Sequence, residues 1–296
     1  MPQQLQHAAT ALKDGRVVAF PTETVYGLGA DAHNPLAVRQ IFALKGRPAN
    51  HPLIVHIHSA SQASTWAQMT PLAHTLAERF WPGPMTMILR RTSHTPDEVT
   101  GGQETVGLRV PAHPTARALL GAFGGGVAAP SANRFGRVSP TTAQHVRDEF
   151  GDTIMILDGG PCTVGVESTI IDLSGDAPAL LRPGGLPVEA IIPVTGPLQG
   201  PSTVRAPGTL ASHYAPHTAL IVTSRPDEEA RRQRAMGRQV AILRAGDTEA
   251  HARRLYAELR RLDAQGVDVL IAEPAPGGGG LAMAINDRLA RAAAPT

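Results

Sequence analysis

The chain of 296 residues has a formal net charge of +2, a sequence pI of about 9.0 and a mean hydropathy of -0.08. This length is typical of two domains, and so mild a charge gives by itself no reason to expect a nucleic-acid-binding protein. The single cysteine, Cys162, excludes an internal disulfide and a cysteine-based metal cage within one chain. No apolar run has membrane length and the N-terminal residues lack the apolar core of a signal peptide, so we expect a cytoplasmic protein.

The first part of the chain predicts a strand, a helix and a second strand, with polar residues at their ends. Val17 to Phe20 is a short apolar run typical of a strand, and residues 53–57 form another. Between them, Asn34 is typical of a helix start and Gly46 of a helix end. Folds of this kind place ligands at the rim of such a unit. The polar residues expected at this rim are Thr22, Glu23, Thr24, Tyr26, Lys45, Arg47, His51 and His56.

The rest of the chain predicts one larger and one smaller domain. Up to residue 193, strands and helices alternate without strict regularity, which favours an α/β or α+β fold with a mixed twisted sheet. Residues 194–217 are rich in Pro, Gly, Ser and Thr and predict an extended linker. Residues 218–296 contain three strand and helix pairs, which predict a small doubly wound, Rossmann-like domain.

Several loops carry residue types that suit phosphate. KGRP, residues 45–48, places two cations around a glycine at a helix end, although Lys45 could simply complement the helix dipole. PSAN, residues 130–133, and SPTT, residues 139–142, put hydroxyls and free backbone N–H groups between a strand and a helix. Simple helix capping by Ser139 or Thr141 explains the second loop equally well.

Two arginines lie at strand positions where an unpaired positive charge would be energetically unfavourable. Arg109 lies in an otherwise apolar strand, so it must bond either a structural carboxylate or the carboxylate of a ligand, and the sequence does not decide between them. Arg182 stands at a strand end, where a ligand contact is favoured. Ser168 lacks a G-x-S-x-G context, which argues against a serine hydrolase. Walker, G-x-G-x-x-G and metal-ligand spacings are also absent from the sequence.

Taken in order, the motifs PTETVYGLGADA, KGRP, PLIVHI, TVGLRVP, APSAN with SPT, ESTI and LLRPG closely resemble those of YrdC-type threonylcarbamoyl-AMP synthases. HYAP, which contains Tyr214 and follows the linker, resembles the two-domain, Sua-type branch of that family. The resemblance implies a YrdC-like catalytic domain at 1–193 and a small Sua-type domain at 218–296. Two positions depart from the family pattern: His51 replaces a usual Asn, and Phe135 replaces a commoner small polar residue.

The resemblance implies a nucleotidyltransferase that condenses L-threonine, bicarbonate or CO2, and ATP, with Mg2+ accompanying the ATP and no metal held by protein spacing. The threonylcarbamoyl-AMP product would pass to a transferase machinery that modifies tRNA, and weak tRNA binding is a further expectation. The residues implied for threonine are Thr24, His56, Arg109 and Ser168. Those implied for ATP are Lys45, Arg47, His51, Thr105, Ser131, Asn133, Ser139, Arg182 and Tyr214, with Lys45, Arg47 and Arg182 expected to act in catalysis.

Two other functions compete with the synthase interpretation. An RNA-binding module is one, but an aromatic content of 4% leaves few stacking platforms. A carbamoyl-transfer enzyme that uses carbamoyl phosphate is the other, because related domains occur in hydrogenase maturation proteins. The absence of acylphosphatase and zinc-finger segments from the sequence argues against it.

Overall fold

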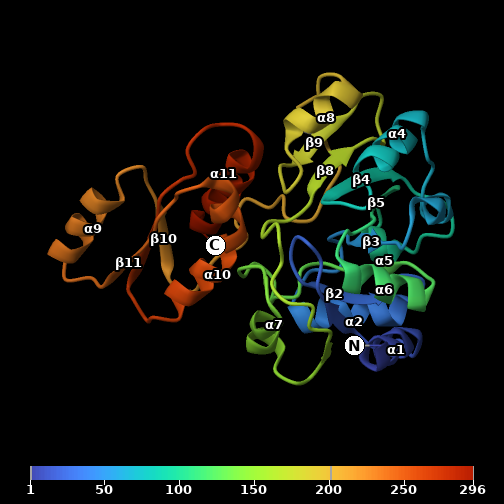
Figure 1. Ribbon diagram of the computed structural model, residues 1–296, viewed down its shortest axis with the longest axis horizontal. Helices are drawn as coiled ribbons and strands as arrows, with labels where there is room; N and C mark the ends of the chain where they lie inside the picture. Colours follow the sequence, from blue (N-terminus) through green and yellow to red (C-terminus); the bar gives the residue numbers. More distant parts are fainter. Residues whose placement is uncertain (1, 201, 296) are drawn as a thin grey trace.

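The computed structural model describes residues 2–200 and 202–295, so residues 1, 201 and 296 of the expected domains and linker lie outside the described part. Two lobes lie side by side, each built around its own sheet (Figure 1). The larger lobe contains a nine-stranded sheet and the smaller one a three-stranded sheet. No helix in the described ranges has both the length and the apolar character needed to cross a membrane.

The large sheet has the strand order β7-β1-β2-β6-β3-β5-β4-β8-β9. Its strands are β1 (Val18–Phe20), β2 (Gly27–Asp31), β3 (Ile54–His56), β4 (Met85–Arg90), β5 (Thr105–Arg109), β6 (Val127–Ala128), β7 (Met155–Ile156), β8 (Thr169–Asp172) and β9 (Ala179–Arg182). Three neighbouring pairs are parallel, β1 with β7, β3 with β5 and β4 with β8, and the others are antiparallel. The expected mixed sheet is therefore confirmed.

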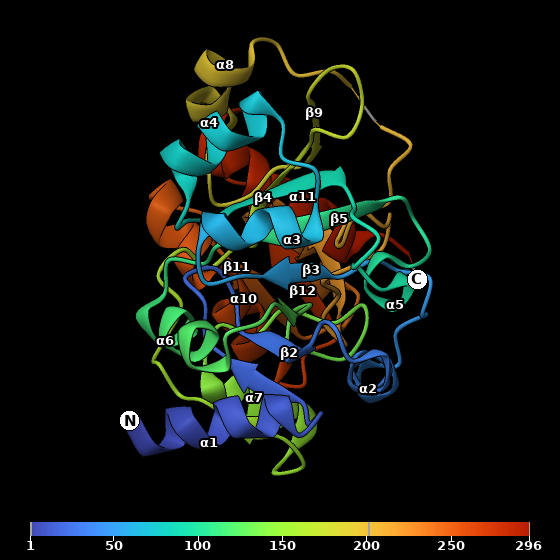
Figure 2. The same ribbon diagram turned by 90° about the vertical axis from the view of Figure 1, so that its right-hand side faces the viewer.

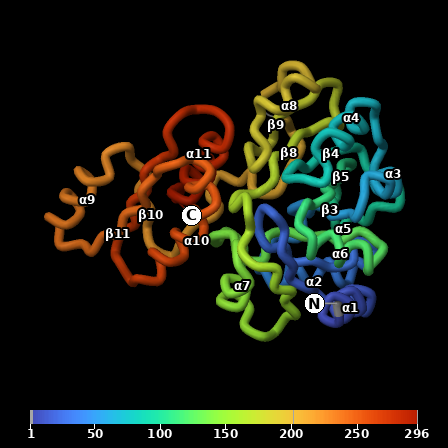
Figure 3. Tube along the Cα trace, viewed as in Figure 1, coloured from blue at the N-terminus to red at the C-terminus, as the bar shows by residue number. Residues whose placement is uncertain are grey.

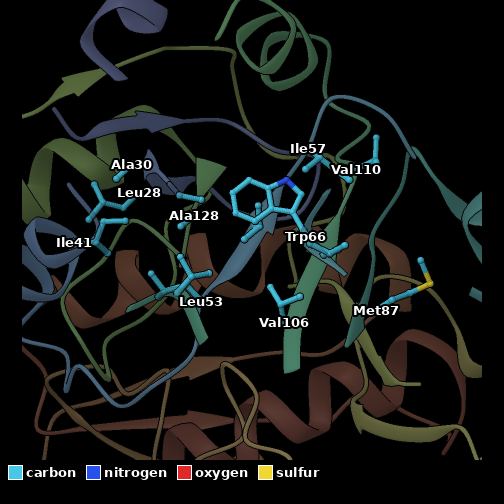
Figure 4. Close-up of a cluster of buried hydrophobic side chains, with 14 of the residues drawn as sticks. Leu28, Ala30, Ile41, Leu53, Ile57, Trp66, Met87, Val106, Val110 and Ala128 are labelled. Atoms are coloured by element: carbon cyan, nitrogen blue, oxygen red, sulfur yellow. The ribbon is translucent and has the colours of Figure 1, made fainter. Parts of the chain in front are cut away.

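Helices surround this sheet and enclose its main core (Figure 2). They are α1 (Pro2–Lys13), α2 (Pro35–Lys45), the 3-10 turn η1 (Ala60–Gln62), α3 (Ala63–Trp66), α4 (Pro71–Phe80), α5 (Asp97–Thr100), α6 (Pro114–Phe123), α7 (Ala143–Phe150) and α8 (Val188–Thr195). Leu28, Ile41, Leu53 and Trp66 are among the most deeply buried side chains of the core (Figure 4). Burying each large side chain stabilises the fold by roughly 1.5–3 kcal/mol.

Helix α2 sets the position of the basic loop at the site. The Asn34 side chain accepts hydrogen bonds from the Leu36 and Ala37 N–H groups, and Gly46 ends the helix in the left-handed conformation with φ 64°. Both ends agree with the sequence prediction. Lys45 is consequently the last residue of the helix, and the turn at Gly46 directs Arg47 away from the helix axis.

Strand β2 was not predicted, because its sequence GLGAD contains two glycines and reads like a loop. The sheet requires a glycine at one of these positions. A Cβ on Gly29 would lie 2.6 Å from a Val127 methyl and 2.7 Å from the Phe20 ring. Gly29 therefore allows a close approach of neighbouring side chains across the sheet.

The chain leaves the large lobe after α8, which ends two residues into the expected linker, and residues 196–200 and 202–218, which belong to no helix or strand, precede β10 (Figure 3). The small sheet has the order β10-β12-β11 and is entirely parallel. Its elements are β10 (Ala219–Val222), α9 (Pro226–Ala235), β11 (Val240–Leu243), α10 (Thr248–Asp263), β12 (Val269–Ala272) and α11 (Gly280–Ala293). Helix α9 covers one face, while α10 and α11 cover the face turned toward the large lobe (Figure 1). The doubly wound arrangement is thus confirmed.

Candidate functional site

One pocket lies where the ends of several strands meet the linker. Its lining comprises Thr22, Thr24, Val25, Gly27, Arg47, Ile54, His56, Arg109, Ala129, Pro130, Ser131, Glu167, Ser168 and Arg182 from the large lobe and Pro207, Gly208, His213 and Tyr214 from the linker. Eight of the residues expected at the site are among them: Thr24, Arg47, His56, Arg109, Ser131, Ser168, Arg182 and Tyr214. The cavity that remains is about 50 Å³, much less than the roughly 300–1,000 Å³ of small-molecule sites. Four linker residues thus form part of the wall of a small cavity in this conformation.

Arg109 bonds a carboxylate of the protein itself, which is one of the two possibilities that the sequence left open. One terminal nitrogen of Arg109 donates to Glu23 Oε1 at 2.7 Å, and the other donates to Thr24 Oγ1 at 2.9 Å. Its Nε donates to the Gly83 carbonyl at 3.3 Å. Two of its five N–H groups remain for a ligand in the pocket. Arg109 is thus held in place by Glu23 while it still faces the cavity.

His56 is a neutral acceptor at the pocket wall. Its Nδ1 lies 3.2 Å from the Ile54 carbonyl oxygen, which can only accept, so Nδ1 carries the hydrogen and Nε2 has a free lone pair. Burial, together with the charge of Arg109, lowers the pKa of His56 to about 3. The imidazole therefore stays neutral at pH 7 and can accept a hydrogen bond from a ligand, but it is too weakly basic to remove a proton efficiently.

Ser168 and Arg182 form one unit beneath the linker. The Arg182 guanidinium donates to the Ser168 carbonyl from Nε at 3.1 Å and from a terminal nitrogen at 2.8 Å. Its other terminal nitrogen donates to the Pro207 carbonyl of the linker at 2.9 Å. The Ser168 hydroxyl lies 2.8 Å from the Thr86 hydroxyl. The linker backbone is thereby tied directly to a pocket arginine.

Lys45, Arg47 and Arg182 are buried cations whose hydrogen bonds go to neutral groups. Lys45 donates to the carbonyl oxygens of Ser131 and Asn133, and Arg47 donates to that of Pro52. Across residues 2–200 and 202–295, none of the three cations forms an ion pair with a carboxylate. Burial lowers the pKa of Arg47 to about 10 and lowers that of Lys45 as well. Burying unpaired positive charge is unfavourable, so the arrangement is suited to an anionic ligand.

Five of the expected residues do not line the cavity: Lys45, His51, Thr105, Asn133 and Ser139. Lys45 and Asn133 shape the loop behind it, since the Asn133 amide donates to the Arg134 and Arg137 carbonyls. The Ser139 hydroxyl donates to Glu167 Oε1 at 2.6 Å. Thr105 begins β5, opposite Arg90 and four residues before Arg109 along the strand.

The two departures from the family pattern contact each other. The rings of His51 and Phe135 meet edge to face with centroids 5.4 Å apart, and the Arg47 guanidinium lies 5.7 Å from the Phe135 ring centre. Phe135 also meets His213 of the linker edge to face at 6.0 Å. Together, His51 and Phe135 connect the basic loop to the linker with an aromatic contact instead of polar ones.

Tyr214 is held between the lobes in a strained conformation. Its φ of 63° is unusual for a bulky residue, and such strain costs on the order of 1–3 kcal/mol. Its ring lies 5.8 Å from the Tyr256 ring and 5.2 Å from the Arg288 guanidinium, both from the small lobe. The Tyr214 hydroxyl is buried and has no hydrogen-bond partner within the described ranges. Strain and an unpaired hydroxyl are typical of a residue that changes partners in function.

Glu167 lines the pocket but was not among the residues expected at the site. Its Oε2 accepts a hydrogen bond from the Tyr256 hydroxyl at 2.8 Å and from Arg288 Nε at 2.7 Å. Burial alone would raise the pKa of Glu167, but the charges of Arg288 and Arg182 and the hydrogen bonds it accepts lower it to about 2. The only sequence signal was its position just before Ser168 in the ESTI motif.

Comparison with known proteins shows to which family the chain belongs. The family model of Sua5, YciO and YrdC proteins, described as "Telomere recombination", matches residues 10–184. The chain belongs to this family. A second model, the C-terminal domain of threonylcarbamoyl-AMP synthase, matches residues 186–294, which identifies the two-domain branch.

Full-length relatives of this family carry one shared name. The threonylcarbamoyl-AMP synthase of Pyrococcus abyssi is 42% identical over 98% of this chain and 94% of its own length. That of Bacillus subtilis is 41% identical over 98% of this chain and 93% of its own length. The crystal structure of P. abyssi Sua5 complexed with L-threonine matches with a TM-score of 0.92 at 42% identity, covering 98% of this chain and 94% of that one. The fold and both domains are therefore those of this branch.

Proposed function

We propose that this protein is an L-threonylcarbamoyladenylate synthase, which condenses L-threonine, bicarbonate or CO2, and ATP into threonylcarbamoyl-AMP and pyrophosphate. One observation carries the proposal: Lys45, Arg47 and Arg182 are buried and bond only neutral groups. Arg47 and Arg182 line the same cavity as Arg109 and His56, and Lys45 lies in the loop behind it. The site thus offers one region for a polyphosphate and another for an amino acid.

The amino-acid side of the site suits threonine. The two free N–H groups of Arg109 would take the carboxylate, and His56 Nε2 would accept a hydrogen bond from the ammonium or hydroxyl group. Thr24 and Ser168 add hydroxyls on either side of this region. Since the pKa of His56 is about 3, its role is to orient threonine rather than to deprotonate it.

The nucleotide side supplies charge compensation. The neutral amine of threonine adds to CO2, forming a C–N bond and releasing a proton to solvent, which gives a carbamate. An oxygen of that carbamate attacks the α-phosphate of ATP with pyrophosphate as leaving group. No protein nucleophile is needed, so catalysis depends on aligning two anions and neutralising charge on the triphosphate. Lys45, Arg47 and Arg182 would do this, each charge-assisted bond contributing roughly 1.5–3 kcal/mol.

Mg2+ would enter with ATP as part of the substrate. The described residues contain no group of three His, Cys, Asp or Glu side chains that could hold a metal ion. The one carboxylate of the pocket lining, Glu167, already accepts hydrogen bonds on both oxygens. A phosphate-bound Mg2+ that keeps most of its waters fits such a site better than a protein cage would.

The linker acts as a lid in this proposal. Pro207, Gly208, His213 and Tyr214 fill a pocket whose remaining cavity is about 50 Å³, so they must move before ATP and threonine can bind together. Closure of Tyr214 over the bound nucleotide would then exclude water from the reactive carbamate.

The deciding experiment is pyrophosphate release by the full-length protein with Mg2+ and ATP. The proposal expects release that requires both L-threonine and bicarbonate, together with a product of the mass of threonylcarbamoyl-AMP. Release that requires carbamoyl phosphate would instead support the carbamoyl-transfer alternative. ATP left intact in every mixture, with tRNA binding that falls steeply with salt, would favour the RNA-binding alternative. Transfer of the product to a tRNA-modifying machinery stays a prediction.

A further inference from the structure

Glu167 presents an electrostatic problem at the proposed ATP site. It is the one carboxylate of the pocket lining within the described residues, and its side chain is 7% exposed. A buried negative charge beside a triphosphate repels it strongly, because little water screens the interaction. The same charge would also attract a guanidinium of the site that is needed for ATP.

The large-lobe guanidinium that the charge of Glu167 affects is that of Arg182. Its charge contributes to lowering the pKa of Glu167, second only to that of Arg288 among the charged groups. Even so, Arg182 donates to the carbonyls of Ser168 and Pro207 and not to Glu167. Another cation therefore satisfies the carboxylate and leaves Arg182 facing the pocket.

The small lobe provides this other cation through α11. Arg288 is 1% exposed, and its Nε donates to Glu167 Oε2 at 2.7 Å. One terminal nitrogen donates to the Pro183 carbonyl at 2.9 Å, next to Arg182 in the chain. The guanidinium also stacks on the Tyr214 ring of the linker. One side chain thus contacts the pocket carboxylate, the turn after β9 and the lid.

We propose that Arg288 is a positioning residue of the catalytic site: it neutralises Glu167, so that Arg182 stays available to the triphosphate of ATP. This inference rests on the proposed function. It assigns the small lobe an electrostatic role in ATP binding, in addition to carrying one end of the linker. The charge of Arg288 is the property that matters, and its packing is secondary.

The test compares Arg288→Gln with a matched control, Arg260→Gln. Arg260 also joins the lobes through a largely buried ion pair, to Glu149 at 2.6 Å, but Glu149 does not line the pocket. Both variants should lose thermal stability. Only Arg288→Gln should raise the KM for ATP, by about tenfold or more, with the KM for threonine within about threefold of wild type.

Two further variants separate charge from structure. Arg288→Lys retains the positive charge, and Glu167→Gln/Arg288→Gln removes both charges, so each should keep the KM for ATP within about threefold of wild type. These two variants still test the proposal if Arg288→Gln does not fold. A KM for ATP raised more than tenfold in either of them overturns the proposal, as does an equal effect of Arg288→Gln and Arg260→Gln. A wild-type protein that neither binds nor consumes ATP refutes the proposed function itself, a result distinct from these.

Discussion

Arg109 Nη2 and Glu23 Oε1 lie 2.7 Å apart in an ion pair whose side chains are 4% and 7% exposed. The two residues come from different motifs, and the pair fixes the guanidinium so that its free edge faces the pocket. Arg109 therefore has one of the two partners that the sequence left open, a structural carboxylate, and its two remaining N–H groups are those that we propose bind the carboxylate of threonine.

Arg109→Lys should raise the threonine KM by about tenfold or more, because an ammonium cannot hold Glu23 and a ligand carboxylate with one planar fork. Steady-state pyrophosphate release at varied threonine measures this. Arg91→Lys is the control, since Arg91 pairs with Asp97 and Glu104 on the surface away from the pocket. An Arg109→Lys protein that loses stability but keeps its threonine KM would leave Arg109 with a structural role alone.

Lys45→Ala should lower kcat/KM for ATP by between about tenfold and 150-fold, as expected for one lost charge-assisted bond. The matched control is Lys13→Ala, because Lys13 ends α1 as Lys45 ends α2. Arg182→Ala should have an effect of the same order. If the role of Lys45 is structural alone, Lys45→Ala will lose stability, because Lys45 is buried and bonds two carbonyls, but its kinetics will match those of Lys13→Ala.

Gly208→Ala tests the lid. Gly208 has a φ of +76°, and a Cβ there would collide with the Tyr214 hydroxyl and lie 2.9 Å from an Arg182 terminal nitrogen. Gly196→Ala is the control, since Gly196 has a φ of +73° and no heavy atom within 4 Å of the added Cβ. The first variant should raise the ATP KM several-fold more than the second. Equal kinetics would show that contact with the linker does not shape the ATP site.

Acid should destabilise the protein in two windows. Burial lowers the pKa values of His56 and His213 from 6.5 to about 3, so the unfolded chain binds more protons than the folded one between these values. The resulting stability is complete above pH 6.5 and is lost as the pH falls toward 3, with a slope of up to about 2.7 kcal/mol per pH unit. Glu167, shifted from 4.5 to about 2, adds a loss that begins below pH 4.5.

Urea unfolding at pH 8, 6 and 5 measures this slope. His213→Gln should lower by about one the number of protons that the chain takes up on unfolding. The free energy of unfolding should therefore depend less on pH between 6.5 and 5. An unfolding free energy that stays constant from pH 8 to 5 would show that His56 and His213 are not buried in the neutral form.

Local patterns predicted β1, α2, β3 and the three strand and helix pairs of the small lobe, and eight of the eighteen residues that line the pocket were among those implied by the family resemblance. Asn34 and Gly46 marked α2 correctly because caps are local signals. Strand β2 was not predicted because its glycines allow close packing against Phe20 and Val127, and these two residues lie elsewhere in the sequence. Arg182 and Tyr214 could be expected from ordered motifs, but the contact of Glu167 with Arg288 joins residues 121 positions apart. No spacing rule links two residues on different lobes, so that contact required the structure.

Apolar side chains of the two lobes pack together, and this contact has a consequence for how the protein is synthesised. Val25, Val138 and Val166 of the large lobe share one apolar cluster with residues of α10 and α11, such as Leu255 and Ile285. The ribosome synthesises these valines well before it reaches either helix. A nascent large lobe therefore keeps an apolar face uncovered next to its own pocket, and that face is closed only when the last helix leaves the exit tunnel.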